Sequence, residues 1–138
     1  MRKELRAIAL RWMVEIWQEG KVGAVDELHA PDFIDHSPGS RNSDNEGFKS
    51  GVRDHYKTFP DFYAATEELA IDEAAGKVTI LWAATGTQVG EYLGVPPSGR
   101  RIAFRGIEIL RIENDKIVER WGEWDGMDLL VKLGLWKG

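Results

Sequence analysis

Apolar residues over the first sixty positions recur at helical spacing. Between residues 3 and 19 they fall three or four positions apart, and Gly20 stands where such a helix would end. The same spacing predicts a short helix that stops before Pro31 and a longer helix that stops at Pro60. The helices predicted in this way cover residues 3–19, residues 22–29 and the stretch after the polar loop 39–45, with residues 32–38 as a brief extended segment before that loop.

After Pro60 the period of the apolar positions changes to two, which is typical of strands. Turn residues at 72–76 and the pair Asn114-Asp115 predict hairpin turns, and the prolines and glycines of residues 90–99 predict a loop. The predicted strands cover residues 62–71, 77–88, 102–112 and 116–125, and a closing helix covers residues 126–133. Helices followed by an antiparallel meander predict an α+β domain with the helices on one face of the sheet.

The last predicted hairpin carries two carboxylates on one face. Pairing the residues that flank its Asn-Asp turn places Glu108 opposite Trp121 and Phe104 opposite Asp125. Because side chains alternate between the two faces of a sheet, these four side chains would share one face. A slip of one residue in the pairing would separate them.

Length and composition restrict the possible partners. The 138 residues suffice for a single domain that spans residues 1–138, and 43% hydrophobic with 30% charged residues is ordinary for a soluble globular protein. A net charge of -5 without a basic stripe argues against a nucleic-acid partner. The sequence has neither a secretory leader pattern nor a run of 18 apolar residues, so we expect no membrane partner and a cytoplasmic location.

No metal or cofactor is expected. Without cysteine, the chain has no thiolate nucleophile and no Cys-ligated metal. His29, His36 and His55 lack the spacing of a zinc site, and no phosphate loop or dinucleotide fingerprint is present. We expect His55 to be a surface residue or a core filler.

Carboxylates among aromatic side chains are the candidate chemistry. Burial raises the pKa of a carboxyl group toward neutrality, where it can take a proton from carbon next to a carbonyl. Asp125 and Glu108 are the candidates, although Asp125 could equally cap the closing helix, and Glu108 could pair with Arg120 or Arg105. His36 is either an acid–base group or a turn residue bonded to local backbone.

Three segments share their order and spacing with one known family. They are FIDHSP at residues 33–38, GTQVGEYLGVPPSGRR at residues 86–101, and RGIEI at residues 105–109 followed by Trp121 and Asp125. Together they resemble the SnoaL-like polyketide cyclases over nearly the whole chain. The resemblance implies a nuclear transport factor 2-like fold: an α+β cone of helices on a curved, mainly antiparallel sheet that encloses a hydrophobic pocket. It also implies a homodimer formed through the sheet.

For function, the resemblance implies a cofactor-independent polyketide ester cyclase, or a related lyase or isomerase, acting on a hydrophobic carbonyl compound. Asp125 falls on the position of the family's proposed base, with His36 and Glu108 assisting. Gln88 stands where many relatives have histidine. The residues expected to contact the substrate are Trp82, Gln88, Phe104, Trp121, Phe59 and Tyr92.

Two other functions stay open, because one fold hosts many activities. The first is a non-catalytic protein that binds a small apolar ligand, which exposed or ion-paired candidate carboxylates would favour. The second is a hydrolase such as an epoxide hydrolase, which would need an Asp-Arg-Asp relay to position a water molecule. The spacing of Arg105 and Glu108 puts these two residues on opposite faces of a strand and disfavours such a relay.

Overall fold

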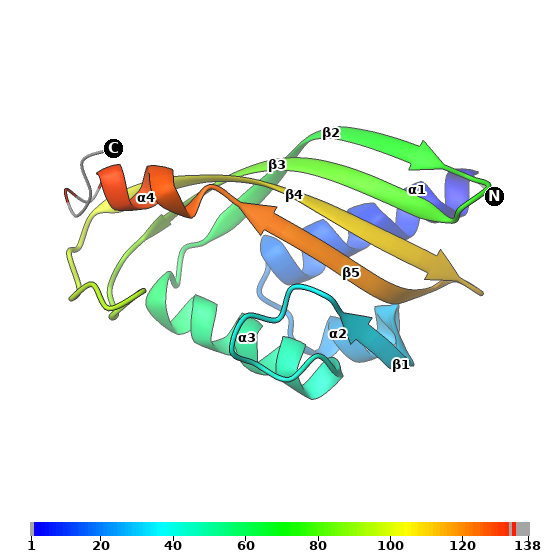
Figure 1. Ribbon diagram of the computed structural model, residues 1–138, viewed down its shortest axis with the longest axis horizontal. Helices are drawn as coiled ribbons and strands as arrows, with labels where there is room; N and C mark the ends of the chain where they lie inside the picture. Colours follow the sequence, from blue (N-terminus) through cyan, green and yellow to red (C-terminus); the bar gives the residue numbers. More distant parts are fainter. Residues whose placement is uncertain (1, 133, 135–138) are drawn as a thin grey trace.

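The computed structural model describes residues 2–132 and 134 and contains one curved, unclosed sheet with helices packed against it (Figure 1). The sheet has the strand order β1-β5-β4-β3-β2. The elements are α1 (Arg2–Arg11), the π-helical turn η1 (Trp12–Ile16), α2 (Gly23–Leu28), β1 (His29–Asp35), α3 (Asn45–Thr58), β2 (Tyr63–Asp72), β3 (Lys77–Thr87), β4 (Arg101–Glu113), β5 (Lys116–Trp124) and α4 (Gly126–Lys132). The last residue of the predicted closing helix, Leu133, lies outside the described residues.

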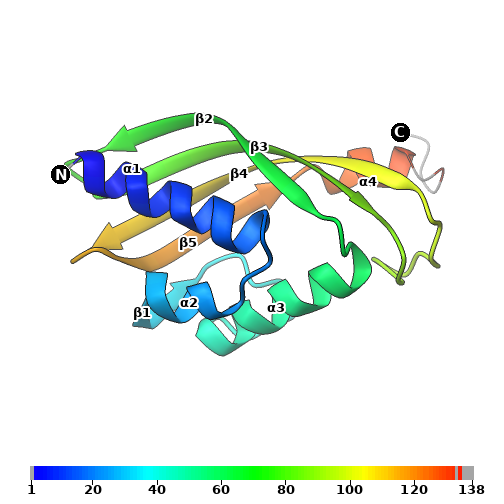
Figure 2. The same ribbon diagram turned by 180° about the vertical axis from the view of Figure 1, so that it is seen from behind.

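Helices α1, α2 and α3 lie on one side of the sheet, and α4 follows the end of β5 (Figures 1 and 2). The continuous helical segment formed by α1 and η1 buries Ala9, Trp12 and Ile16 in the core, as its apolar spacing predicts. Gly20 ends it with a φ of 68°, a left-handed conformation that glycine adopts without steric cost. The α+β class and the side on which the helices pack are therefore confirmed. Among the described residues, no helix is long and apolar enough to cross a membrane.

The sheet has one more strand than predicted. Residues 29–35 form β1, which pairs in parallel with β5, whereas the sequence predicted only a brief extended segment at residues 32–38 without a place in the sheet. Pro31 lies inside this strand, where it is tolerated because β1 is at the edge of the sheet. The predicted four-strand antiparallel meander is confirmed as β2 to β5, and β1 is an additional strand that was not predicted.

The register of the last hairpin also differs from the prediction. The Asn114-Asp115 turn, with positive φ at both residues, forms as expected, but the pairing shifts by one residue beyond Ile112. Glu108 therefore lies opposite Gly122, and Trp121 lies opposite Ile109 on the other face of the sheet. The predicted pairs of Glu108 with Trp121 and of Phe104 with Asp125 were wrong.

Gly122 explains why the shifted register is favourable. A Cβ atom at this position would lie 2.3 Å from the Arg120 guanidinium and 2.6 Å from the Glu108 carboxylate. The glycine thus leaves room for both charged side chains on the inner face of the sheet. The predicted register would instead have put the Trp121 side chain next to Glu108.

Candidate functional site

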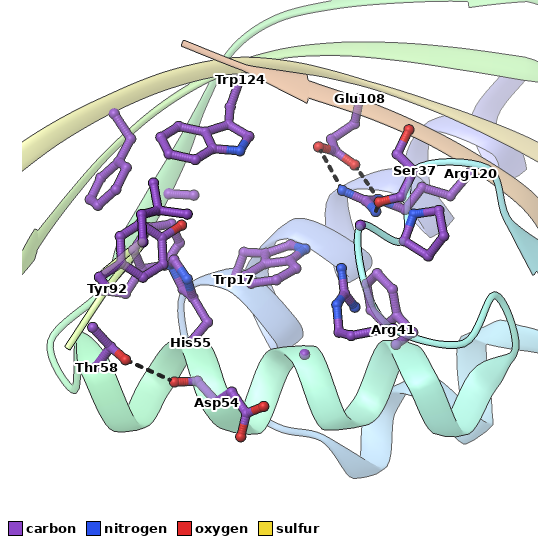
Figure 3. A pocket seen from close by; sticks show the side chains of 18 of the residues that line it. Trp17, Ser37, Arg41, Asp54, His55, Thr58, Tyr92, Glu108, Arg120 and Trp124 are labelled. Atoms are coloured by element: carbon purple, nitrogen blue, oxygen red, sulfur yellow. Dashed lines mark hydrogen bonds and ion pairs between the residues drawn. The ribbon is translucent and has the colours of Figure 1, made fainter. Parts of the chain in front are cut away.

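A cavity of about 900 Å³ lies between the inner face of the sheet and α3 (Figure 3). Volumes of this size are usual for sites that bind small molecules. Its wall is mixed rather than purely hydrophobic. The aromatic lining residues are Trp17, Phe48, Phe62, Trp82, Tyr92, Phe104 and Trp124, and the charged or polar ones include Ser37, Arg41, Asp54, His55, Glu91, Glu108 and Arg120.

Arg120 joins two buried carboxylates at one side of this cavity. Its Nε donates to Glu108 Oε1 at 2.6 Å, and its Nη1 donates to Asp35 Oδ1 at 3.0 Å and Oδ2 at 3.1 Å. The Asp35 side chain is fully buried and those of Glu108 and Arg120 are 7% and 12% exposed. The pairing of Glu108 with Arg120, one of the two arginines considered for it, is therefore confirmed. Because both carboxylates are hydrogen-bonded to one guanidinium, Arg120 fixes the orientation of each.

Burial raises the pKa of Glu108 above its usual value, and the nearby Asp35 carboxylate acts in the same direction. Arg120 opposes this shift, as does a hydrogen bond with the Trp82 side chain. Burial alone would lower the pKa of Arg120, but Glu108 and Asp35 raise it, so the guanidinium stays charged. Glu108 is thus a carboxylate with increased basicity that is held in one orientation.

Gly106 allows Trp82 to reach Glu108. The two strands place Trp82 opposite Gly106, and a Cβ atom at Gly106 would lie 2.3 Å from the indole ring. With no side chain at this position, the indole lies across β4 beside Glu108. Phe104, also on the inner face of β4, is 4% exposed and lines the cavity.

His55 lines the cavity from α3, and its Nε2 has no hydrogen-bond partner among the described residues. The imidazole packs edge-on against Phe62, with ring centroids 4.3 Å apart, and tilted against Phe59 at 5.1 Å. Burial lowers its pKa to about 4, and Arg41 adds to this shift, so the ring is neutral at pH 7. Buried polar atoms are rarely left unpaired in folded proteins, so this nitrogen is an exception in the part of the chain that the structure describes.

The expectation that His55 is only a surface residue or a core filler misses this position. The available signal was its place in α3 beside the apolar residues Phe48, Val52 and Phe59. Arg41, another lining residue without a predicted role, comes from a loop for which the sequence shows no pattern.

Four predicted site residues line the cavity: Glu108, Trp82, Phe104 and Tyr92. Phe59 lies behind this wall, fully buried, with its ring 5.0 Å from that of Tyr92. The structure therefore brings together the acidic candidate on β4 and most of the aromatic candidates.

Asp125 has a different environment. It is exposed and does not belong to the cavity lining, and its carboxylate accepts a hydrogen bond at 2.9 Å from the backbone N–H of Asp128 in the first turn of α4. This is the helix cap that the sequence offered as the alternative role. Catalysis by Asp125 stays a prediction.

His36 and Trp121 lie together outside the cavity lining. Their rings stack at 4.6 Å, and His36 Nε2 is 2.6 Å from the Glu119 carboxylate. The prediction that Trp121 shares a face with Glu108 was wrong because of the shifted register. A catalytic role of His36 stays a prediction.

Gln88 is fully buried and anchors a loop instead of lining the cavity. Its amide nitrogen donates to the carbonyl oxygens of Gly90 at 3.0 Å, Val95 at 3.2 Å and Pro96 at 3.2 Å, and its amide oxygen accepts from Ser98 Oγ at 2.7 Å. These bonds hold the loop that carries Tyr92. Gln88 can therefore affect the cavity through the position of that loop.

The described residues include no group of three His, Asp or Glu side chains that could hold a metal ion.

Comparison with known families shows that the profile described as SnoaL-like polyketide cyclase matches residues 7–133. The chain belongs to this family. Among SnoaL-like relatives, aklanonic acid methyl ester cyclase AcmA of Streptomyces galilaeus is 31% identical over 124 residues, which cover 86% of this chain and 84% of AcmA.

A second SnoaL-like relative is nogalonic acid methyl ester cyclase of Streptomyces nogalater. It is 27% identical over 118 residues, covering 83% of this chain and 87% of the relative. Among solved structures, TsrD from Streptomyces laurentii superposes with a TM-score of 0.87 at 25% identity, covering 99% of this chain and 98% of TsrD. IdmH from Streptomyces antibioticus has a TM-score of 0.81 at 26% identity, covering 94% and 98% of the two chains. The fold predicted from the resemblance is confirmed.

Proposed function

We propose that this SnoaL-like protein closes a ring in a polyketide-type carbonyl compound, with Glu108 as the base. The observation that carries the proposal is the placement of Glu108: a buried carboxylate with a raised pKa that faces a cavity of substrate size. Of the three catalytic candidates from the sequence, only Glu108 belongs to that lining. The family relationship supports a cyclase reaction.

The reaction needs only proton transfers and one new carbon–carbon bond. Glu108 removes a proton from carbon next to a carbonyl, and the resulting enolate carbon attacks a second carbonyl carbon of the same molecule. The alkoxide formed there takes the proton back from the Glu108 carboxyl group. Since the product is an isomer of the substrate, the balance requires no redox partner. The raised pKa makes Glu108 a stronger base for the proton abstraction.

His55 is the proposed hydrogen-bond donor to the developing oxyanion. It faces the cavity from α3, across from Glu108 on the sheet (Figure 3). Because Nε2 is buried within the protein, the neutral ring would donate from Nδ1 when that nitrogen carries the proton. A donor positioned before the reaction stabilises charge that develops during it. Because the pKa of His55 is low, its ring does not take up the proton that Glu108 removes from the substrate.

The test is incubation of the purified protein with aklanonic acid methyl ester and nogalonic acid methyl ester, with separation of products by chromatography. We expect a product of unchanged mass from at least one compound, and no product from Glu108→Gln. Asp54→Asn is the matched control, because it removes a different carboxylate that also lines the cavity. Equal turnover by Glu108→Gln and the wild-type protein would refute Glu108 as the base.

A hydrolase is the second candidate, because the structure contains a carboxylate–arginine–carboxylate relay. Asp35, Arg120 and Glu108 form it, in place of the Arg105–Glu108 combination that the sequence disfavoured. Such a relay could orient a water molecule toward an epoxide. Reaction in ¹⁸O-labelled water separates the two proposals, since hydrolysis adds the mass of one labelled water and ring closure adds none.

A purely binding function is the remaining alternative, and the ion pair between Glu108 and Arg120 favours it over a free catalytic carboxylate. Tight binding of either methyl ester without any product, in the same incubation, would support that function.

The homodimer through the sheet stays a proposal as well. Its support is the outer face of the sheet, where Ile107 is 46% and Tyr63 is 52% exposed. Sedimentation velocity of the wild-type protein and Ile107→Glu tests it: a dimer that the charge disperses supports the proposal, and a wild-type monomer at high concentration refutes it. The cytoplasmic location remains a prediction from the sequence.

A further inference from the structure

We infer that Arg41 binds a carboxylate on an aromatic ligand in the cavity, an inference that takes from the proposed function only the cavity as the ligand site. Arg41 belongs to the loop between β1 and α3 and lines the cavity. Its guanidinium points into the cavity from the α3 side (Figure 3). The inference therefore concerns which ligand enters, independently of the reaction that follows.

The Arg41 guanidinium makes one hydrogen bond among the described residues. Nη1 donates to the carbonyl oxygen of Gly47 at 3.2 Å, and no other hydrogen bond of this side chain is found within residues 2–132. The bond to Gly47 leaves the edge formed by Nε and Nη2 free. That edge presents two parallel N–H groups, the geometry that binds a carboxylate through two hydrogen bonds.

The position of Arg41 is built into α3. A Cβ atom at Gly51 would lie 2.1 Å from Arg41 Nη1 and 2.9 Å from its Cδ, so the side chain crosses the helix where only glycine leaves room. At Gly47 a Cβ atom would lie 2.0 Å from the carbonyl oxygen of Asn42 in the same loop. Glycine inside a helix is less favourable than alanine by about 1 kcal/mol. The two glycines are explained by this close approach of the loop, which holds Arg41 against the helix.

Arg41 is also the lining cation without a carboxylate partner. Arg120, the other one, is neutralised by Asp35 and Glu108, whereas no salt bridge to Arg41 is found among the described side chains. Asp54 and Glu91 line the cavity as well, but both are exposed to solvent. Burial is the largest effect on the pKa of Arg41 and lowers it, whereas the charges of Asp35 and Asp54 act in the opposite direction without a direct ion pair. The arginine remains charged at neutral pH. A half-buried charge is stabilised by a ligand of opposite charge.

The other lining residues indicate the chemical class of the ligand whose carboxylate Arg41 would bind. Trp17, Trp82, Tyr92 and Trp124 offer flat apolar surfaces, which fit fused aromatic rings. The combination of these rings with Arg41 therefore favours an aromatic carboxylic acid over its neutral ester. AcmA and the nogalonic acid cyclase are named for methyl esters, so this chain would differ from those relatives in the group it recognises.

Isothermal titration calorimetry with a matched pair of probes tests the inference. Anthraquinone-2-carboxylic acid and its methyl ester share the ring system and differ in charge. At pH 7.5 and low salt we expect the wild-type protein to bind the acid about tenfold more tightly than the ester, a modest value for a charge-assisted bidentate contact. In Arg41→Gln the two affinities should become equal through a loss for the acid alone.

Two further variants keep the result interpretable. Arg53→Gln removes the same charge from an exposed position of α3 outside the cavity lining and should retain the preference for the acid. Arg41→Lys keeps the charge but loses the forked geometry, so an intermediate preference is expected. Thermal melting of each variant excludes unfolding as the cause of a lost preference.

Three results would overturn the inference: equal affinity of the wild-type protein for acid and ester, an unchanged preference in Arg41→Gln, or no binding of either probe. Because binding is measured without turnover, failure of the cyclase proposal leaves the tenfold preference intact. Conversely, a protein that converts methyl esters but shows no preference for the acid would retain the proposed function and lose this inference.

Discussion

Replacing His55 by phenylalanine is expected to remove much of the acid sensitivity of the fold. The pKa of His55 is lowered by burial from 6.5 to about 4, so between these two values the unfolded chain binds more protons at this residue than the folded protein does. Stability therefore falls as the pH falls from 6.5 toward 4. Above pH 7 the residue is neutral in both states and contributes no pH dependence.

The size of this effect follows from the two pKa values. At pH 5.0 the unfolded state gains RT ln[(1+10^1.5)/(1+10^-1)], or about 2 kcal/mol, from protonation of His55. His29, whose pKa burial also lowers to about 4, contributes a similar amount that is unchanged by the substitution. Phenylalanine would also remove the unpaired Nε2, so stability at pH 7.5 should stay equal or rise by about 1 kcal/mol.

Urea unfolding followed by tryptophan fluorescence at pH 7.5 and pH 5.0 measures the effect. For each protein the free energies of unfolding at the two pH values are subtracted, and comparing this difference between the two proteins cancels the contributions of the groups that they share. The difference should be about 2 kcal/mol smaller in His55→Phe than in the wild-type protein. An equal difference in both proteins would show that His55 is solvated or paired in the fold and would refute its proposed position.

Three other substitutions give direct predictions. Arg120→Met leaves two buried carboxylates without their cation and should lower the free energy of unfolding by about 3–5 kcal/mol in a urea titration, whereas exposed Arg53→Met should change little. Gln88→Leu removes the bonds that hold residues 89–99 and should speed limited proteolysis within that loop, with cleavage elsewhere unchanged as the control. Gly51→Ala forces Arg41 to move and should reduce the preference for the acid probe in calorimetry. An undiminished preference would contradict the inference that Gly51 leaves the room in which the Arg41 side chain is held against α3.

Regular apolar spacing predicted most of the fold. The period of 3.6 in residues 3–19 and the period of two in residues 62–125 place helices and strands close to their observed bounds. Strand β1 was not predictable in this way, because it is short, contains Pro31 and begins inside a helical pattern. Its pairing with β5 is a contact between segments more than eighty residues apart, which local periodicity does not encode.

Long-range contacts also limit how much of the candidate site can be predicted from the sequence. Glu108 and its aromatic neighbours were found because they alternate along predicted strands. Asp35 meets Arg120 only through the β1–β5 pairing, because Arg120 stands 85 positions later in the sequence. The shift in the hairpin had a weak signal in the adjacent apolar pair Ile117-Val118, which interrupts the alternation. His55 and Arg41 reach the cavity by tertiary packing of α3 and its loop, for which the sequence carries no motif.

In the proposed reaction, proton abstraction takes place at Glu108 inside the cavity, while Asp125 caps α4. The most direct measurement is the turnover of Glu108→Gln and Asp125→Asn on whichever methyl ester the wild-type protein converts. Asparagine keeps the oxygen that accepts the N–H of Asp128, so the helix cap is preserved in the second variant. We predict a loss of about 10²–10⁴-fold in kcat for Glu108→Gln and a change within about twofold for Asp125→Asn. The opposite pattern, with Asp125→Asn inactive and Glu108→Gln active, would contradict the account.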